Sequence, residues 1–348
     1  MPSSSSPLKK ITIYDVARAA GVGTTTVSRV LNDDPAVKPQ TRDSVLATIT
    51  ALGYRPNIAA RSTGGGGKSR WVALLYQNPV IHYIHPMQQG AIERCRAADH
   101  MLSVHACQHT GAALITEVLD IVHQLQPSGL ILTLPLSLSP ELVQALTERQ
   151  VHHVRVAPDG MDHPSARVYF DEHGAARAMT RTLIAQGHRR IGFVSGLPEG
   201  HVQPDARRQG FQEAMNEAGL KVAAHQLACG SFHFEEALGP LHAMLDRKQR
   251  PTAVFCANDD MAAAALQVAA ELGLSVPADL SVAGFDDSYV ARIVTPRLTT
   301  VRQPLHEMGS EAADMILRGQ AEPQHGYQRV LPFAMVEGRS TAQAPKLV

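Results

Sequence analysis

The stretch ITIYDVARAAGVGTTTVSRVLN, residues 11–32, decides the N-terminal fold. Its first half has apolar residues at i, i+3, i+4 and i+7, the spacing of one helix face: Ile13, Val16, Ala17 and Ala20. Thr12 stands where a helix cap is expected, and Asp15 is an acidic residue in the first turn. Gly21-Val22-Gly23 then predicts a tight turn, because glycine tolerates backbone angles that other residues avoid.

A second short helix is predicted from Thr24. Its apolar face holds Val27, Val30 and Leu31. Its polar face carries Thr25, Thr26, Ser28 and Arg29. A third helix is expected from Pro39 to Leu52, ending at Gly53. Two short helices around a glycine turn, the second with a hydroxyl-rich and arginine-bearing face, are typical of a helix-turn-helix. Periodicity alone also fits three small helices of a larger domain.

Charge favours the helix-turn-helix interpretation. The net formal charge of the whole chain is zero, yet residues 1–70 hold ten Lys and Arg against four Asp and Glu, and the remainder holds 22 against 28. A basic N-terminal module on an acidic body suits a nucleic-acid binder with a separate regulatory domain, since phosphate neutralisation supplies most non-specific affinity. We therefore expect a disordered tail at residues 1–10 and a DNA-binding headpiece at 11–56.

The cysteines and the hydropathy indicate a cytoplasmic protein. Four cysteines stand far apart without a CxxC pair, and no signal-peptide core follows the first methionine. No apolar run approaches the roughly 20 residues needed to cross a bilayer, so no membrane partner is expected.

From Trp71 onward, short apolar segments alternate with amphipathic ones, which predicts a parallel α/β sheet flanked by helices. The clearest expected strands are 72–76, 130–134, 190–194, 253–256 and 281–285, with helices at 175–185 and 261–272 between them. One such unit needs about half of this length, so two similar lobes are expected within 71–338. Residues 339–348 are expected to form a tail.

Polar side chains follow several of these strands. Gln77-Asn78, Asn258-Asp259 and Asp286-Asp287 each come directly after an apolar run, and Arg207 opens the helical stretch ARRQGFQEAM. Ligands of open α/β sheets bind at the carboxyl ends of the strands. Carboxylates, amides and an arginine are suited to a hydroxylated ligand.

The sequence contains partial matches to motifs for phosphate binding, catalysis and metal binding, but each match lacks a required residue. GGGGKS at 64–69 has Ser62 where a phosphate-binding loop needs glycine, and GFVSG at 192–196 has Phe193 where a nucleophile elbow needs one. His82 with His85, and the run from His105 to His109, have no second pair at metal-ligand spacing. We expect no catalytic residue, no metal and no cofactor.

The stretches IYDVARAAGVGTTTVSRVLN, VKPQTRDSV and LGYRPNIAARS resemble the headpiece of the LacI/GalR family of transcription regulators, and the similarity continues over nearly the whole chain. The resemblance implies base contacts in the major groove from Thr24, Thr25 and Arg29. It implies backbone contacts from Thr12, Tyr14, Thr26, Ser28 and Asn32. Arg pairs well with guanine, and short polar side chains reach phosphates. Gly23 replaces the serine usual in the family, and glycine caps a helix less well.

The family also has a hinge helix that forms on operator DNA and wedges a leucine into the minor groove. Residues 57–70 are expected to contain this hinge and a glycine-rich linker, with DNA contacts from Asn57, Ala60, Arg61 and Thr63. Thr63 stands at the position of the wedging leucine and four glycines follow it. Glycine disfavours helix by about 1 kcal/mol relative to alanine, so the hinge should end at Ser62 or Thr63.

The resemblance further implies an all-α headpiece on a two-lobed, periplasmic-binding-protein-like α/β domain whose chain crosses three times between lobes. The expected lobes are 71–167 with 299–327, and 168–298 with 328–338. The implied effector residues are Asn78, Asp171, Arg207, Phe232, Asn258, Asp286 and Gln303, with Phe232 packing on a sugar ring. A polar residue at a strand end can instead cap the next helix. For Asp171 and Asp259 the two roles are equally favoured, whereas the ligand role is favoured for Arg207, Asn258 and Asp286.

The function expected from these patterns is a repressor whose operator binding is controlled by a small sugar or sugar derivative. A dimer is expected because two headpieces meet a two-fold operator, and because RSTAQAPKLV after Gly338 is too short and polar for a leucine-zipper tetramer. The alternative is a carbohydrate-binding protein or an enzyme on an α/β scaffold, which would have no use for residues 11–62.

Overall fold

The computed structural model of the chain describes residues 11–31, 34–54, 69–77, 80–156, 164–196, 205–322 and 326–345. Six of the expected site residues lie outside these ranges: Asn32, Asn57, Ala60, Arg61, Thr63 and Asn78. The expected tail at 1–10 and nearly all of the hinge and linker also lie outside them. The chain divides into two compact units, one with the N-terminal helices and His109–Ser128, the other with Val72–Gln108 and the chain from Gly129 onward.

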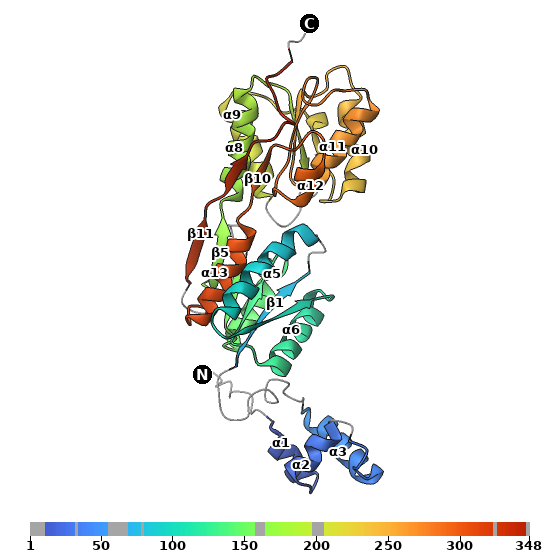
Figure 1. Ribbon diagram of the computed structural model, residues 1–348, viewed down its shortest axis with the longest axis vertical. Helices are drawn as coiled ribbons and strands as arrows, with labels where there is room; N and C mark the ends of the chain where they lie inside the picture. Colours follow the sequence, from blue (N-terminus) through green and yellow to red (C-terminus); the bar gives the residue numbers. More distant parts are fainter. Residues whose placement is uncertain are drawn as a thin grey trace, which may run out of the picture. The chain divides into compact units, whose positions relative to one another are not determined.

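The N-terminal helices have the expected bounds, and they appear in blue in Figure 1: α1 Ile13–Ala19, α2 Thr24–Leu31 and α3 Pro39–Leu52. Their apolar faces close a small core of Val16, Ala17, Val27, Val30 and Val45. Gly21 has a φ of 67° and Gly53 a φ of 63°, so both turns use the left-handed conformation that glycine adopts without strain. The helix-turn-helix predicted from periodicity is confirmed in its helices and its turn.

The first lobe is built on a six-stranded sheet of order β11-β5-β4-β3-β1-β2. Its strands are β1 Trp71–Tyr76, β2 Met101–Ala106, β3 Gly129–Leu132, β4 His153–Val156, β5 Ala166–Phe170 and β11 Gln328–Leu331. The pairs from β1 through β3, β4 and β5 to β11 are parallel. The helical segments of this part of the chain are α5 Ile81–Arg96, α6 Gly111–Leu125, η1 Leu136–Leu138, α7 Pro140–Glu148 and α13 Leu305–Leu317.

The second lobe has a parallel four-stranded sheet of order β7-β6-β8-β9. Its strands are β6 Ile191–Ser195, β7 Leu227–Cys229, β8 Ala253–Cys256 and β9 Ser281–Ala283. Its helical segments are α8 Glu172–Ala185, α9 Ala206–Glu217, η2 Ala224–Gln226, α10 Phe234–Leu245, α11 Asp259–Glu271 and α12 Tyr289–Ile293. A separate antiparallel pair joins β10 Thr300–Arg302 to β12 Ala334–Val336. The strands and helices expected from the sequence are therefore present, with bounds shifted by a few residues.

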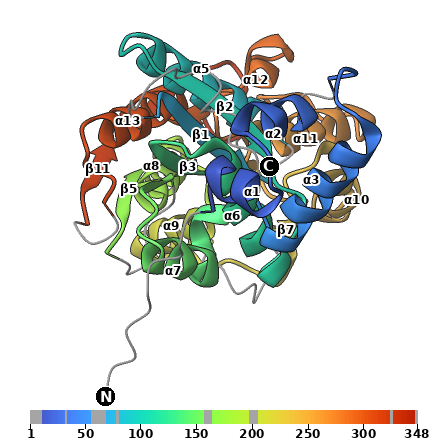
Figure 2. The same cartoon turned by 90° about the horizontal axis from the view of Figure 1, so that it is seen from below.

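Close helix packing in each lobe depends on glycine. In the first lobe α5 and α13 lie side by side (Figure 1 and Figure 2), and a Cβ placed on Gly90 would come within 1.9 Å of the His306 carbonyl oxygen. In the second lobe α8 packs on α9, and a Cβ on Gly210 would come within 2.2 Å of the His173 carbonyl oxygen. A side chain at either glycine would separate its helix pair.

The crossings between lobes differ from the expected boundaries by a few residues. β5 continues to Phe170 in the first sheet, and β11 pairs with β5, whereas the sequence predicts residues from 168 and residues 328–338 in the second lobe. Residues 299–302 were assigned to the first lobe, yet Gly284 N donates to Thr299 O at 2.9 Å and Asp286 N donates to Val301 O at 2.7 Å. These hydrogen bonds hold β10 on the second lobe, because Thr299 and Arg302 form parallel bridges with Ala283 and Asp286 beside the end of β9.

The expected tail at 339–348 is folded over its described part. Ser340 is fully buried, and its hydroxyl donates to Val282 O at 2.5 Å and accepts from Thr299 N at 2.8 Å. The ring of His188 lies 3.1 Å from Ala342 O, and Ala344 N donates to Gln186 O. This segment carries no helix or strand periodicity, so its attachment through backbone groups leaves no pattern in the sequence.

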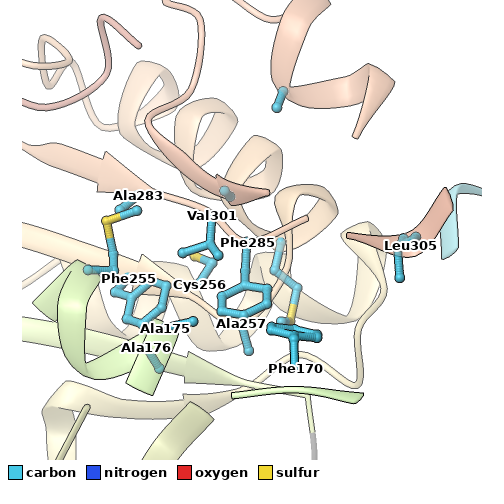
Figure 3. Packing of buried hydrophobic residues seen from close by; sticks show 14 of the residues in the cluster. Phe170, Ala175, Ala176, Phe255, Cys256, Ala257, Ala283, Phe285, Val301 and Leu305 are labelled. Carbon is cyan, nitrogen blue, oxygen red and sulfur yellow. The ribbon is translucent and has the colours of Figure 1, made fainter. Parts of the chain in front are cut away.

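The core behind the strand ends is aromatic. Figure 3 shows Phe255 and Phe285 packed among small residues, with Phe170 beside Phe285. The ring centroids of Phe170 and Phe285 are 6.3 Å apart, and those of Phe193 and Phe211 are 4.9 Å apart and stacked. Phe170 ends the last central strand of the first lobe, so this contact joins the two lobes in one core.

Membrane-spanning helices and groups of metal ligands are both absent from the residues that the structure describes. Within the ranges given above, no helix is long and apolar enough to cross a membrane. Among the same residues, no three His, Cys, Asp or Glu side chains are grouped as a metal site requires.

Candidate DNA-binding surface and effector site

The polar face of α2 is open to solvent. Thr25 and Arg29 are exposed, and Thr24, Thr26 and Ser28 are half-buried. Val27 and Val30, on the opposite face, are buried against α1 and α3. Tyr14 of α1 is 69% exposed. The structure therefore presents the side chains predicted to contact DNA on the outside of the headpiece, with the helix held from behind by its apolar residues.

Thr12 has a structural partner within the headpiece. Its hydroxyl donates to Asp15 Oδ2 at 2.7 Å, and its backbone N donates to the same oxygen at 2.9 Å. Asp15 N in turn donates to the Thr12 hydroxyl at 3.4 Å, which completes a capping box at the start of α1. The predicted backbone contact of Thr12 with DNA would be made by a side chain whose position this box fixes.

Arg29 is held loosely. Its guanidinium Nε lies 3.8 Å from Asp34 Oδ2, and 60% of the side chain is exposed. The other oxygen of Asp34 accepts from Ala36 N at 2.9 Å, so the carboxylate belongs to the turn before α3. An exposed ion pair of this length contributes between zero and about 1 kcal/mol. Arg29 is therefore free to turn toward a base at little cost.

A candidate effector site in the second lobe is organised around Arg207, near the start of α9. The guanidinium donates through Nε to Glu172 Oε2 at 3.1 Å and through Nη2 to Glu172 Oε1 at 3.4 Å. Nη1 donates to the Ala257 carbonyl oxygen, and the guanidinium carbon lies 4.0 Å from the centroid of the Phe285 ring. Only 8% of Arg207 is exposed. Burial acts to lower the pKa of Arg207, but the carboxylates of Glu172 and Asp286 raise it, so the side chain stays charged.

Asp286 and Gln303 lie beside this arginine. Asp286 Oδ1 accepts a hydrogen bond from Gln303 Nε2 and is 3.8 Å from Arg207 Nη1. Asp286 has a φ of 128°, which is unusual for a residue other than glycine and costs free energy. Burial raises the pKa of Asp286 well above its usual range, against the opposing charge of Arg207. The structure thus brings together Asp286, predicted from its place after a strand, Arg207, predicted at a helix start, and Gln303, implied by the family resemblance.

Gln303 has an unused acceptor. The side chain is 5% exposed, and its Oε1 atom is buried without a hydrogen-bond partner among the described residues. A buried acceptor left unpaired costs about 1–3 kcal/mol. A hydroxyl or amine of a ligand would remove that cost.

Two residues of this site were missed in the sequence. Glu172 is the first residue of α8 and the direct partner of Arg207. Tyr83 of α5 comes from the first lobe, and burial raises its pKa, with the charges of Glu172, Arg207 and Asp286 also acting on the phenol. Glu172 directly follows the predicted Asp171, so its place in the sequence could have indicated a role at this site. No sequence pattern indicates such a role for Tyr83, because an aromatic residue near the start of a helix is common.

Three predicted polar residues act within the fold. Asp171 is exposed and caps α8, with Oδ1 accepting from Gly174 N at 2.6 Å. Asn258 caps α11 through Oδ1, and its Nδ2 donates to Phe232 O at 2.9 Å. Asp259 is buried and accepts from the Thr300 hydroxyl at 2.6 Å and from Ser288 N at 2.7 Å. Each of these side chains therefore acts as a helix cap or has a buried structural partner.

Phe232 lies beside Gly196 and Arg207. Its ring covers Gly196 so closely that a Cβ there would be 2.0 Å from Phe232 Cζ, and Arg207 lies 5.9 Å from the ring centroid. Its φ is 63°, and the hydrogen bond from Asn258 fixes its carbonyl group. One cation, two carboxyl groups, an amide and aromatic rings can bind a small polar molecule.

Comparison with known proteins covers both parts of the chain. The model of the family described as bacterial regulatory proteins, lacI family, matches residues 12–57, and that of a periplasmic binding protein-like domain matches residues 180–341. The HTH-type transcriptional repressor PurR of Proteus mirabilis is 35% identical over 342 residues, covering 96% of this chain and 98% of that protein. Catabolite control protein A of Priestia megaterium is 31% identical over 309 residues, covering 88% and 92%.

Solved structures agree with these relatives. The transcriptional regulator CelR in complex with cellobiose has a TM-score of 0.69 at 30% identity, covering 95% of this chain and 99% of that one. The lac repressor dimer bound to operator and the anti-inducer ONPF has a TM-score of 0.70 at 29% identity, covering 96% and 100%. The relatives are transcription regulators rather than enzymes. The chain thus belongs to the lacI family of bacterial regulatory proteins, and it is a DNA-binding transcription regulator with a helix-turn-helix headpiece and a two-lobed sensor domain.

Proposed function

We propose that this protein is a repressor that leaves or holds its operator according to a small hydroxylated molecule, a sugar or sugar derivative, bound beside Arg207. The observation that carries the proposal is the buried group of Arg207, Asp286 and Gln303, which offers a charge, a carboxylate and an unpaired acceptor in one place. Hydroxyl groups match this set because they both donate and accept. The solved CelR structure contains cellobiose, which supports a carbohydrate.

The DNA contacts of the proposal are those on the exposed side of the headpiece. Thr24, Thr25 and Arg29 would read bases, and the short polar residues around them would contact phosphates. Asn32 and the hinge residues Asn57, Ala60, Arg61 and Thr63 stay predictions, because they lie outside the described ranges. We expect the protein to act on DNA in the cytoplasm.

The test is a gel shift with the full-length protein and DNA taken from beside its own gene. We expect a specific complex that changes on addition of one mono- or disaccharide from a panel, and an Asp286→Ala variant that binds the same DNA but no longer responds. Purine bases form a second arm, because several relatives carry the name PurR. A response to a purine alone would overturn the carbohydrate assignment. Absence of any specific complex would overturn the repressor.

We also propose a homodimer, because a two-fold operator requires two headpieces and the lac repressor was solved as a dimer on its operator. In this chain Tyr289 and Ile293 of α12 are 66% and 57% exposed, an apolar pair suited to a second copy. Sedimentation should give a dimer at micromolar concentration, and Ile293→Asp should shift it toward monomer. A stable tetramer would contradict the dimeric state. An unchanged dimer in the Ile293→Asp variant would contradict the contact through α12.

A further inference from the structure

The charges around Arg207 leave no net positive charge for an anion. Glu172 forms two hydrogen bonds with the guanidinium, and its side chain is only 12% exposed. Asp286 and Asp205 also act on the same cation. Even if Asp286 is protonated, Glu172 alone balances the charge of Arg207. A phosphate or carboxylate entering this site would meet a guanidinium that is already paired.

The unpaired groups of the site are acceptors. Gln303 Oε1 is buried without a partner, and so is Asp205 Oδ2, among the described residues. Asp205 caps α9 with its other oxygen, which accepts from Arg208 N at 3.1 Å, and its charge acts on Arg207 and Glu172. Acceptors need donors, which hydroxyl and amine groups supply and ionised phosphates and carboxylates lack.

We propose that Glu172 sets the charge selectivity of the effector site: by pairing with Arg207 it admits neutral or amine-bearing hydroxylated molecules and excludes phosphorylated or carboxylated ones. This inference rests on the proposed function and narrows its ligand class. Glu172 acts through Arg207 and is a positioning residue. Removing its charge would release one guanidinium edge, and an arginine edge binds carboxylate and phosphate with two parallel hydrogen bonds.

The experiment measures binding of a matched ligand series to the full-length protein by calorimetry and thermal shift. For each of several hexoses the series contains the neutral sugar, the 2-amino sugar, the uronic acid and the 6-phosphate. We expect wild-type protein to bind a neutral or amino member at least tenfold more tightly than the anionic members of the same hexose. Glu172→Gln should reduce this ratio by roughly tenfold or more, the size expected for one charge in a buried site.

Two controls separate charge selectivity from general damage. Glu217→Gln removes a carboxylate from the same helix pair, where Glu217 is held by Arg177 and Arg181 on the outer side of α8 and α9, and it should leave the ratio unchanged. Glu172→Asp keeps the charge and should keep the exclusion of anions, which gives a readout if the glutamine variant folds poorly.

Three results would overturn the inference. Tighter binding of an anionic member by wild-type protein would refute it while leaving a carbohydrate effector in place. An unchanged ratio of neutral to anionic affinity in Glu172→Gln would show that residues other than Glu172 determine the charge selectivity. Failure of the whole series in wild-type protein that still binds operator would refute the carbohydrate class and this inference together.

Discussion

Replacing Arg29 by alanine separates base reading from general attraction to DNA. Arg29 stands on the exposed side of α2, and its side chain is 60% exposed with one weak ion pair to Asp34 at 3.8 Å. Loss of that pair costs the fold at most about 1 kcal/mol, so the headpiece should remain folded around Val27 and Val30. A bidentate arginine contact with guanine is worth about 1–3 kcal/mol, which corresponds to a roughly 5- to 150-fold loss of specific affinity.

The assay is fluorescence anisotropy with an operator duplex and a scrambled duplex of equal length, at one fixed salt concentration. Arg18→Ala is the matched control, because Arg18 is also exposed but lies on α1. The control should weaken both duplexes to a similar, small extent, since it removes one positive charge. Arg29→Ala should weaken the operator duplex far more than the scrambled one. An equal loss on both would make Arg29 a phosphate contact and refute its role as a base reader.

Three further predictions concern the C-terminal segment, one buried histidine and the expected hinge. Deleting residues 339–348 should lower the melting temperature of the sensor domain by several degrees, because the buried bonds of Ser340 to Val282 and Thr299 are lost; an unchanged transition in calorimetry would show that the segment adds nothing. Burial lowers the pKa of His188 below 6.5, so its contribution to stability is present above about pH 6.5 and decreases as the pH falls. His188→Asn should therefore reduce the loss of unfolding free energy below pH 6.5, measured by urea titration at several pH values. An unchanged pH dependence would contradict this role of His188. Thr63→Leu should tighten operator binding and increase the bend of the operator DNA measured by circular-permutation gel shift, because leucine is the better wedge between bases. Equal bends with wild-type and variant protein would show that residue 63 does not insert between bases.

The headpiece could be predicted closely because its signals are local. The cap at Thr12, the glycine turn and the Pro39 start depend on residues within one turn of each other, and all three lie where the sequence placed them. The strands of the sensor domain could be predicted for a similar reason, since each is a short apolar run between turns. Their order in the two sheets, and the crossing points near Phe170 and Leu331, depend on long-range pairing that no single stretch encodes.

The candidate effector site could be predicted only in part. Arg207 and Asp286 meet because strand ends of a parallel sheet lie on one edge, and Gln303 joins them because Arg302 bridges Asp286. The same rule selected Asn258, and the family resemblance implied Asp171; both cap the helices that begin there, and a cap and a ligand residue look alike in sequence. Glu172 and Tyr83 were missed because their roles arise from what the fold places opposite them.

Gln303 lies on the segment that joins the two lobes. It follows β10, which is bonded to the second lobe, and it precedes α13, which packs on α5 of the first lobe. A ligand can shift an equilibrium between conformations only through a difference in its free energy of interaction with them. A donor that pairs with the buried Gln303 Oε1 gains such a difference only in the arrangement that keeps Gln303 beside Asp286 and Arg207. The proposed effector would therefore act on the segment that joins the lobes.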